Sequence, residues 1–316
     1  MALPKKRLAA VSVVGLLFIC SALFYVKYFL LRDVGSGPAG PLVDAAPFAE
    51  VWSDRPVRIV GIGDSVTAGL GADTLSHSYF NRLIRNPDDE YAEMAGRSLS
   101  RVLPNLQEEN FAISGSTSRD HLHVIEDRLE THSPDEFGLV VMTSGGNDLI
   151  HSYGRTAPKE CAMYGATLAQ AQPWIDAFRA RLEEMLTKID ASFPGGCEIY
   201  LADIYDPTDG VGDAPSVYLP DWPDGLAIHA RYNQVINEVA AQHPNVHIVP
   251  LYQTFLGHGA HSGQFWRSTY VSEDPHYWFY ENIEDPNDRG YDAIRRVFLN
   301  TILEKSQLVS GPAATL

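Results

Sequence analysis

The sequence is poor in cysteine and in basic residues. It has 3 cysteines among 316 residues, and 24 Lys and Arg residues stand against 40 Asp and Glu, which gives a formal net charge of −16. All of the acidic residues follow Arg32, so that part of the chain is more acidic still. Such a surface repels the phosphates of nucleic acids and anionic lipid headgroups. The charge therefore argues against nucleic acid as a partner. A well-solvated protein surface is a sufficient explanation for the excess of acidic residues.

Patterns that bind metals or cofactors are also missing. Cys20 falls in an apolar segment, and Cys161 and Cys197 lack the spacing of a zinc site, so they form either a disulfide or two buried thiols. His258 and His261 could ligate a metal, but the Glu of a metalloprotease helix is absent and a glycine lies between them. No dinucleotide-binding fingerprint and no P-loop occurs. We expect neither a metal ion nor a cofactor.

Only one apolar run is long enough to cross a bilayer. Residues 8–26 carry no charge, and Lys27 follows near the outer end, where its stem can reach the interface. Lys5, Lys6 and Arg7 precede the run, which favours a cytoplasmic N-terminus and export of the remainder. A cleaved signal peptide is the alternative, but this run is long for one. We expect an uncleaved single-pass anchor in the cell membrane, with the bilayer as partner and the domain on the outer side, periplasmic or extracellular.

Strand-like and helix-like segments alternate in the exported part. The predicted strands are residues 57–62, a run ending at Gly115, and residues 139–142, 199–202 and 246–249; the predicted helices lie near residues 91–103, 122–129, 174–189, 232–239 and 290–302. This alternation predicts a three-layer α/β/α sandwich with a central parallel sheet. We expect residues 1–32 to hold the anchor, 33–55 a linker, 56–305 one domain and 306–316 a tail.

Two long irregular stretches, residues 206–225 and 255–288, are rich in aromatic residues. Both follow predicted strands at the edge where α/β proteins build their sites. Their aromatic side chains could stack on sugar rings or line an acyl pocket. Packing of the loops onto the core is the simpler interpretation for most of them.

Three predicted strands end in small or polar residues. G-I-G-D-S-V-T-A-G at residues 61–69 places Ser65 on a sharp turn before a helix, where its hydroxyl and its N–H can both meet a ligand. The second run ends at Gly115, and the third ends in T-S-G-G-N-D, which contains Asn147. Because parallel strands end along one edge of a sheet, these three residues should meet around one point.

These blocks resemble those of the SGNH, or GDSL-like, hydrolase family. The match consists of G-D-S at residues 63–65, Gly115, and G-G-N-D at residues 145–148, in the family's order. The resemblance covers roughly residues 57–303 and implies the SGNH fold, which is flavodoxin-like. It also implies ester hydrolysis with Ser65 as nucleophile and with the Ser65 amide, the Gly115 amide and the Asn147 side chain as oxyanion donors.

The catalytic base is the point at which the sequence departs from this family. Members carry D-x-x-H before the last helix, but here Asn282 stands in place of the aspartate and Asp285 in place of the histidine. Glu273 and His276 have the family's three-residue spacing, so after growth of the loop His276 would be the base and Glu273 its carboxylate partner. The alternatives are His258, His261, Asp285 acting directly with a raised pKa, or no working base.

We therefore expect a membrane-anchored serine esterase that acts on a small acyl ester, such as an O-acetyl group on an envelope polysaccharide. A non-catalytic SGNH-fold module that binds glycan through its aromatic loops is the alternative from another class. An acyltransferase that uses the same site lies between the two.

Overall fold

Five parallel strands form the centre of the domain. The computed structural model describes residues 5–309 and contains β1 (Val57–Ile62), β2 (Leu106–Asn110), β3 (Phe137–Met142), β4 (Cys197–Ala202) and β5 (Val246–Val249). Their order is β2-β1-β3-β4-β5, and every neighbouring pair is parallel. β1 therefore lies between the other two strands whose ends carry the motif blocks.

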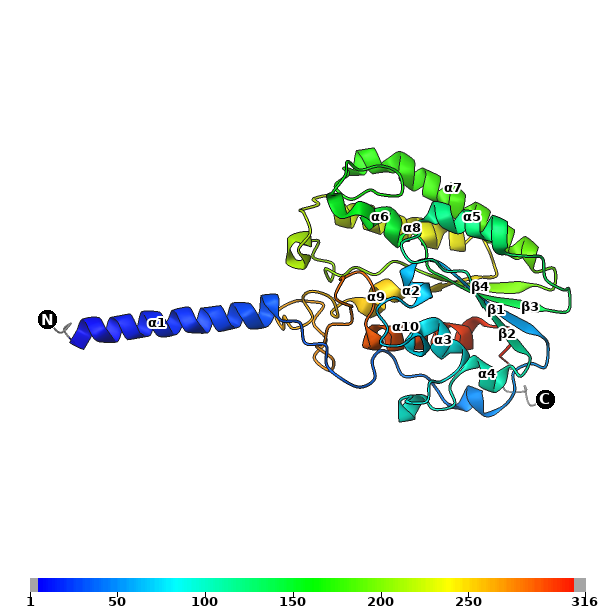
Figure 1. Cartoon of the computed structure of the whole chain (residues 1–316), viewed down its shortest axis with the longest axis horizontal. Coiled ribbons are helices and arrows are strands. Elements are labelled where there is room, and N and C mark those ends of the chain that lie inside the picture. Colours follow the sequence, from blue (N-terminus) through cyan, green and yellow to red (C-terminus); the bar gives the residue numbers. More distant parts are fainter. Residues whose placement is uncertain (1–4, 310–316) are drawn as a thin grey trace.

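Helices cover both faces of this sheet (Figure 1). α5 (Ser118–Arg128), α7 (Leu168–Ser192) and α8 (Gly225–Ala240) lie on one face; α3 (Tyr79–Ile84), α4 (Leu99–Val102) and α10 (Asp288–Lys305) lie on the other. Side chains alternate along a strand, so Val60 and Ile62 pack with the first group, whereas Val57 and Ile59 pack with the second. This arrangement confirms the predicted three-layer α/β/α sandwich.

The prediction of one helix near residues 91–103 was wrong. The structure has η4 (Ala92–Met94) and α4 there, separated by Gly96 with φ +77°. Met94 and Leu99 are nevertheless buried, so the apolar spacing marked a buried face but not a continuous helix. The other short helices are η2 (Ala46–Ala49), α2 (Ser65–Ala68), η3 (Leu75–His77), α6 (Gly146–Ile150), η5 (His151–Gly154), η6 (Ala214–Val217) and α9 (Leu251–Phe255).

The N-terminal helix projects away from the domain (Figure 1). It consists of α1 (Lys5–Tyr25) and a π-helical continuation, η1 (Val26–Leu30). Within residues 5–309 it is the one helix that is long and apolar enough to cross a membrane: Ser12–Leu30 has a mean hydropathy of 2.1, and none of this window is buried. A signal sequence would have the same properties, so length and composition alone leave both interpretations open.

Residues 33–55, predicted as a linker, lie along the domain. The N–H of Ala39 donates a 3.0 Å hydrogen bond to Oδ2 of Asp292 in α10. Phe48 and Trp52 are buried and belong to the core cluster on that face of the sheet. This stretch therefore contributes to the packing of the domain.

The long loops and the cysteines also pack onto the domain. The loop residues Trp222, Trp278 and Phe279 are buried, whereas a minority of the loop aromatics, including Trp266, are well exposed. Most of these rings thus hold the loops to the core. Cys161 and Cys197 are buried free thiols.

Candidate active site

Hydrogen bonds join the three motif blocks at the carboxyl edge of the sheet. Ser116, next to Gly115, donates from Oγ to the carbonyl oxygen of Gly63 at 3.1 Å. Nδ2 of Asn147 in turn donates to the carbonyl oxygen of Ser116 at 2.9 Å. The structure therefore brings together the blocks that contain Ser65, Gly115 and Asn147.

Ser65 begins the one-turn helix α2 directly after a turn that requires glycine. Gly63 has φ +152°, and a Cβ atom there would lie 2.3 Å from Oγ1 of Thr143. Asp64 caps α2, since its Oδ1 accepts a 3.1 Å hydrogen bond from the N–H of Val66. Ser65 is only 7% exposed, and within residues 5–309 no acceptor binds its N–H. Its hydroxyl and its amide are thus fixed at the end of β1.

Two further hydrogen-bond donors come from the neighbouring turns. Gly115 has φ +79° and is exposed, and its N–H binds no acceptor in the described part of the chain. Asn147 is half-buried in the first turn of α6 and uses one N–H of its Nδ2 group on Ser116. The second N–H of that group makes no hydrogen bond with residues 5–309. Three donors therefore remain for a ligand at this edge.

A buried histidine missed by the sequence analysis links the same turns. His121 in α5 is 2% exposed; its Nε2 lies 2.8 Å from Oγ of Ser116, and its Nδ1 lies 2.9 Å from Oγ of Ser144. Burial lowers its pKa to about 4, so the ring is neutral near pH 7. Its spacing of three and four residues from Val124 and Ile125 was the available signal, because it places His121 on the buried face of α5.

Asp285 lies beside the hydroxyl group of Ser65. Its side chain is 0% exposed, and this burial raises the pKa of its carboxyl group above the ordinary value, although the contacts with Ser65 and Asn282 oppose the rise. Nδ2 of Asn282 donates to Oδ2 of Asp285 at 2.6 Å, while the N–H of Asp285 donates to Oδ1 of Asn282 at 3.2 Å. The two residues that depart from the family pattern thus contact each other, and one contacts the serine.

Two more carboxyl groups lie near Asp285. Burial raises the pKa of Asp64 to about 6, although Oγ1 of Thr143 donates to it at 2.9 Å. Burial, and then the charges of Asp285 and Asp64, raise the pKa of Glu284 to about 7. Oε2 of Glu284 is buried and has no hydrogen-bond partner among the described residues. Within residues 5–309, no group of three or more His, Cys, Asp or Glu side chains is arranged to hold a metal ion.

His276, the predicted base, has other partners. Its Nδ1 lies 2.5 Å from Oδ1 of Asp274, and Oδ2 of that carboxylate accepts a 2.6 Å hydrogen bond from Arg289. Its ring packs against Gly35, in the segment that follows the N-terminal helix. Glu273, the predicted carboxylate partner, is exposed. The structure thus pairs His276 with Asp274 rather than with Glu273.

The two alternative histidines are held in other contacts as well. The ring of His258 stacks on Trp278 at 3.4 Å, and burial lowers its pKa to about 4. Nε2 of His261 lies 2.8 Å from Oδ1 of Asp213. In the part of the chain that the structure describes, neither of them, nor His276, bonds to Ser65.

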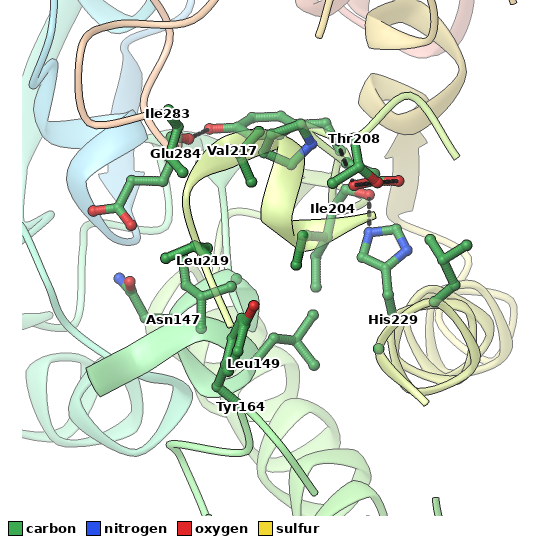
Figure 2. A pocket seen from close by; sticks show the side chains of 18 of the residues that line it. Asn147, Leu149, Tyr164, Ile204, Thr208, Val217, Leu219, His229, Ile283 and Glu284 are labelled. Atoms are coloured by element: carbon green, nitrogen blue, oxygen red, sulfur yellow. Dashed lines mark hydrogen bonds between the residues drawn. The ribbon is translucent and has the colours of Figure 1, made fainter. Parts of the chain in front are cut away.

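An apolar cavity of about 170 Å³ adjoins this edge of the sheet (Figure 2). Asn147 and Glu284 lie at one end of its lining and His229 at the other (Figure 2). Nε2 of His229 lies 2.9 Å from the carbonyl oxygen of Ile204, and burial lowers the pKa of that histidine. The apolar lining includes Leu149, Ile150, Ile204, Val217, Leu219, Leu226 and Ile283. Such a cavity accepts an uncharged carbon chain.

A model of the GDSL-like Lipase/Acylhydrolase family matches residues 62–293. The chain belongs to this family. The match begins at the end of β1 and ends in α10, so it includes all three motif blocks and Asp285. Membership makes the protein a hydrolase of ester bonds.

The chain is similar to the solved structures of a lipase and an esterase at low sequence identity. An extracellular lipase from Streptomyces rimosus is 19% identical, with 79% of this chain and 100% of that chain covered and a TM-score of 0.50. A catalytic mutant of the acetylxylan esterase Axe2 from Geobacillus stearothermophilus is 17% identical, with 82% and 100% covered and a TM-score of 0.48. No curated protein matches the chain in sequence. The similarity to the lipase agrees with the fold described above and leaves the substrate undetermined.

Within the GDSL family pattern, the structure brings Asp285 to the serine. The direct alignment of D-x-x-H with N-I-E-D at residues 282–285 puts Asp285 where the family has its histidine. Asp285 is also the residue beside the Ser65 hydroxyl. In the alternative alignment the loop is longer and His276 is the base. In the described part of the chain, however, His276 bonds to Asp274 and makes no contact with Ser65.

Proposed function

We propose that this GDSL hydrolase is a serine esterase with Ser65 as its nucleophile. The observation that carries the proposal is the position of the Ser65 hydroxyl on a fixed turn, with unused donors on Ser65, Gly115 and Asn147. Oγ of Ser65 attacks the ester carbonyl, and these donors stabilise the oxyanion that forms. Collapse of this intermediate expels the alcohol and leaves an acyl-serine, which water hydrolyses.

The acyl part of the substrate is proposed to occupy the apolar cavity. Asn147 lies at one end of the lining, so the ester carbonyl would be at that end and the carbon chain between Leu149, Ile204 and Leu219. This lining supports an acyl group longer than acetyl. The O-acetyl polysaccharide expected from the sequence stays a prediction, and the dependence of rate on acyl length separates the two substrates.

We also propose that α1 and η1 remain attached and anchor the enzyme in a membrane. The ring of Trp266 stacks on Phe24 at 5.5 Å, and Nε2 of Gln264 donates to the carbonyl oxygen of Tyr28 at 3.0 Å. Arg32 donates to the carbonyl oxygen of Ser216 at 2.5 Å. Cleavage after the helix would remove the first two contacts. Trp and Tyr are enriched where membrane helices meet water, which agrees with this cluster.

The proposed anchor leaves the site on the membrane-facing side of the domain. α2, α6 and α9 begin at the carboxyl ends of β1, β3 and β5, and they lie on the side from which α1 projects (Figure 1). An ester at the membrane surface would therefore reach Ser65 from that side. In this topology the N-terminus is cytoplasmic and the domain is outside. A reporter that is active only in the cytoplasm, fused after Leu316, should be silent; an active fusion would reverse the orientation.

Hydrolysis of chromogenic esters by the full-length chain in detergent tests the proposed function. Wild-type protein should release the chromophore, and Ser65→Ala should lower kcat by several orders of magnitude while leaving the melting temperature unchanged. Ser272→Ala, at an exposed loop serine, is the matched control and should behave like wild type. Equal activity in Ser65→Ala would remove Ser65 from the mechanism.

The same assay separates the alternative functions. Absence of turnover together with measurable glycan binding would favour the non-catalytic module. Acyl transfer to an added alcohol in preference to water would favour the acyltransferase.

A further inference from the structure

We propose that Asp285, held by Asn282, is the general base that takes the proton of Ser65. This inference rests on the proposed function, because a base is needed only if Ser65 is the nucleophile. It assigns the base to a carboxylate in a family whose pattern has histidine at that position. Three independent features carry it: the contact with Ser65, the matched change at residue 282, and the rigid attachment of Asp285.

The carboxyl group of Asp285 is placed and free to receive this proton. It lies beside the Ser65 hydroxyl, and it is 0% exposed, so bulk water does not compete for it. Oδ2 of Asp285 accepts the hydrogen bond from Asn282. Oδ1 is buried, and no donor among the described residues lies in hydrogen-bonding geometry with it. A buried carboxylate oxygen without a partner beside a serine is an acceptor for the serine proton.

The two departures from the family pattern suit each other chemically. A histidine base needs an acceptor for its second ring N–H, which an aspartate at residue 282 would supply. A carboxylate base needs a donor instead, and the Nδ2 group of Asn282 supplies one to Asp285 at 2.6 Å. An aspartate at residue 282 would set two carboxylates against each other. Asn282 is therefore a positioning residue that matches a carboxylate at residue 285.

The backbone around Asp285 is fixed by regular hydrogen bonds. The N–H of Tyr280 donates to the carbonyl oxygen of Asp285 at 2.7 Å. Asn287 donates from its N–H to the carbonyl oxygen of Trp278 at 2.9 Å, and its Oδ1 caps α10 by accepting from Gly290 at 3.0 Å. Asp285 is thus held just before the last helix, where a small displacement would separate it from Ser65.

The surroundings of Asp285 favour it as a base. Burial raises the pKa of its carboxyl group, and its charge in turn contributes to the raised pKa values of Asp64 and Glu284, which therefore hold protons to higher pH than an exposed carboxyl group does. The phenols of Tyr205 and Tyr291 have pKa values well above the ordinary value, mainly because of burial, and stay neutral. Within residues 5–309, no Lys, Arg or His forms an ion pair with Asp285. The carboxylate is therefore more basic than an exposed aspartate.

The proton transfers balance over the catalytic cycle. As Oγ of Ser65 bonds to the carbonyl carbon, its O–H bond breaks and the proton moves to the carboxylate of Asp285. The protonated carboxyl then gives this proton to the departing alkoxide as the carbon–oxygen bond breaks. A water molecule repeats the sequence on the acyl-serine, with Asp285 first accepting and then returning a proton.

Labelling of Ser65 by a fluorophosphonate, measured alongside ester turnover, tests this assignment on the full-length chain in detergent. Asp285→Asn should slow both by about 10²–10⁴-fold, with the melting temperature checked in parallel. His276→Ala and the exposed same-loop control Glu281→Gln should label and turn over like wild type. Asn282→Asp/Asp285→His restores the family's pair and should recover activity with an acid limb near pH ~6–7. The apparent pKa of this limb should change with temperature as the pKa of an imidazole does. In the wild type it should change as the pKa of a carboxyl group does.

The outcomes separate failure of the base from failure of the proposed function. Near-normal labelling of folded Asp285→Asn, while Ser65→Ala is inactive, would overturn the base and leave the serine esterase standing. A wild-type chain that neither labels nor hydrolyses esters would overturn both. If Asp285→Asn does not fold, the acid limb of the pH–rate profile of the double variant tests the assignment. A limb with the temperature dependence of an imidazole supports Asp285 as the base. A limb unchanged from that of the wild type shows that residue 285 is not the base.

Discussion

Nδ2 of Asn282 donates a 2.6 Å hydrogen bond to Oδ2 of Asp285, and this contact reverses the polarity of the corresponding pair in the GDSL family. Where the family has an acceptor that orients a histidine, this chain has a donor that orients a carboxylate. The pair is therefore sensitive to a change that looks conservative. Replacing the amide by a carboxylate removes the donor and adds a charge at the same distance.

Asn282→Asp alone should impair the enzyme more than Asn282→Ala. Two carboxyl groups at hydrogen-bond distance share a proton, which raises the upper of their two apparent pKa values and lowers the fraction of the fully ionised pair at neutral pH. The pH–rate profile measures this as an acid limb at higher pH than in wild type. A profile that is identical in wild type and Asn282→Asp would show that this contact does not orient the base.

Asn147→Ala should lower kcat by about 10²–10³-fold with little change in KM, because it removes one proposed oxyanion donor. Asn237→Ala is the matched control, since Nδ2 of Asn237 binds a backbone carbonyl on the surface of α8. Steady-state kinetics on a chromogenic ester give both constants. Equal kcat values for the two variants would exclude Asn147 from the oxyanion hole.

Neutral, buried His121 should contribute to the free energy of unfolding near pH 7, and this contribution should disappear as the pH falls from about 6.5 to about 4. The folded-state pKa of about 4 lies below the ordinary value of 6.5, so in this window the unfolded chain binds the proton first and unfolding becomes easier. The full effect corresponds to roughly 3 kcal/mol. Denaturant unfolding of wild type and His121→Asn should show a difference that shrinks toward acid pH. A constant difference would contradict a neutral buried ring.

Ile204→Trp should shift the preference of the enzyme toward shorter acyl groups. Ile204 lines the middle of the cavity, and an indole there would fill the volume assigned to the carbon chain. The ratio of kcat/KM for an octanoate ester to that for an acetate ester should fall by about tenfold or more. Leu42→Trp, at a side chain that is 82% exposed, should leave this ratio unchanged. An unchanged ratio in Ile204→Trp would place the acyl group elsewhere.

Local sequence patterns were sufficient to predict the layers of the fold but not all of its helices. Alternation of β-branched runs with three-and-four spacing specifies a parallel sheet covered on both faces, and the structure has it. The helix predicted near residues 91–103 failed because Gly96 takes a left-handed conformation, which the spacing of Met94 and Leu99 does not reveal. Apolar spacing reports burial, and burial does not require a continuous helix.

The site was predictable where it depends on strand ends and unpredictable where it depends on loop packing. Ser65, Gly115 and Asn147 lie in the turns that follow β1, β2 and β3, so the sheet determines that these turns meet; β2 ends at Asn110, however, and not at Gly115 as predicted. The partner of His276 depends on how a loop of about thirty residues folds, and spacing in sequence favoured Glu273 over Asp274. His121 is neutral and buried, and only its place on the apolar face of α5 distinguished it from a surface histidine.

The central claim, that Ser65 is an activated nucleophile, is tested most directly by mass spectrometry of the full-length chain after reaction with a fluorophosphonate. The adduct should lie on the peptide that contains residues 61–69, on Ser65 itself, and it should be absent from Ser65→Ala. Prior incubation with a substrate ester should slow its formation. A folded wild-type chain that forms no adduct, or an adduct on any other residue, would contradict the claim.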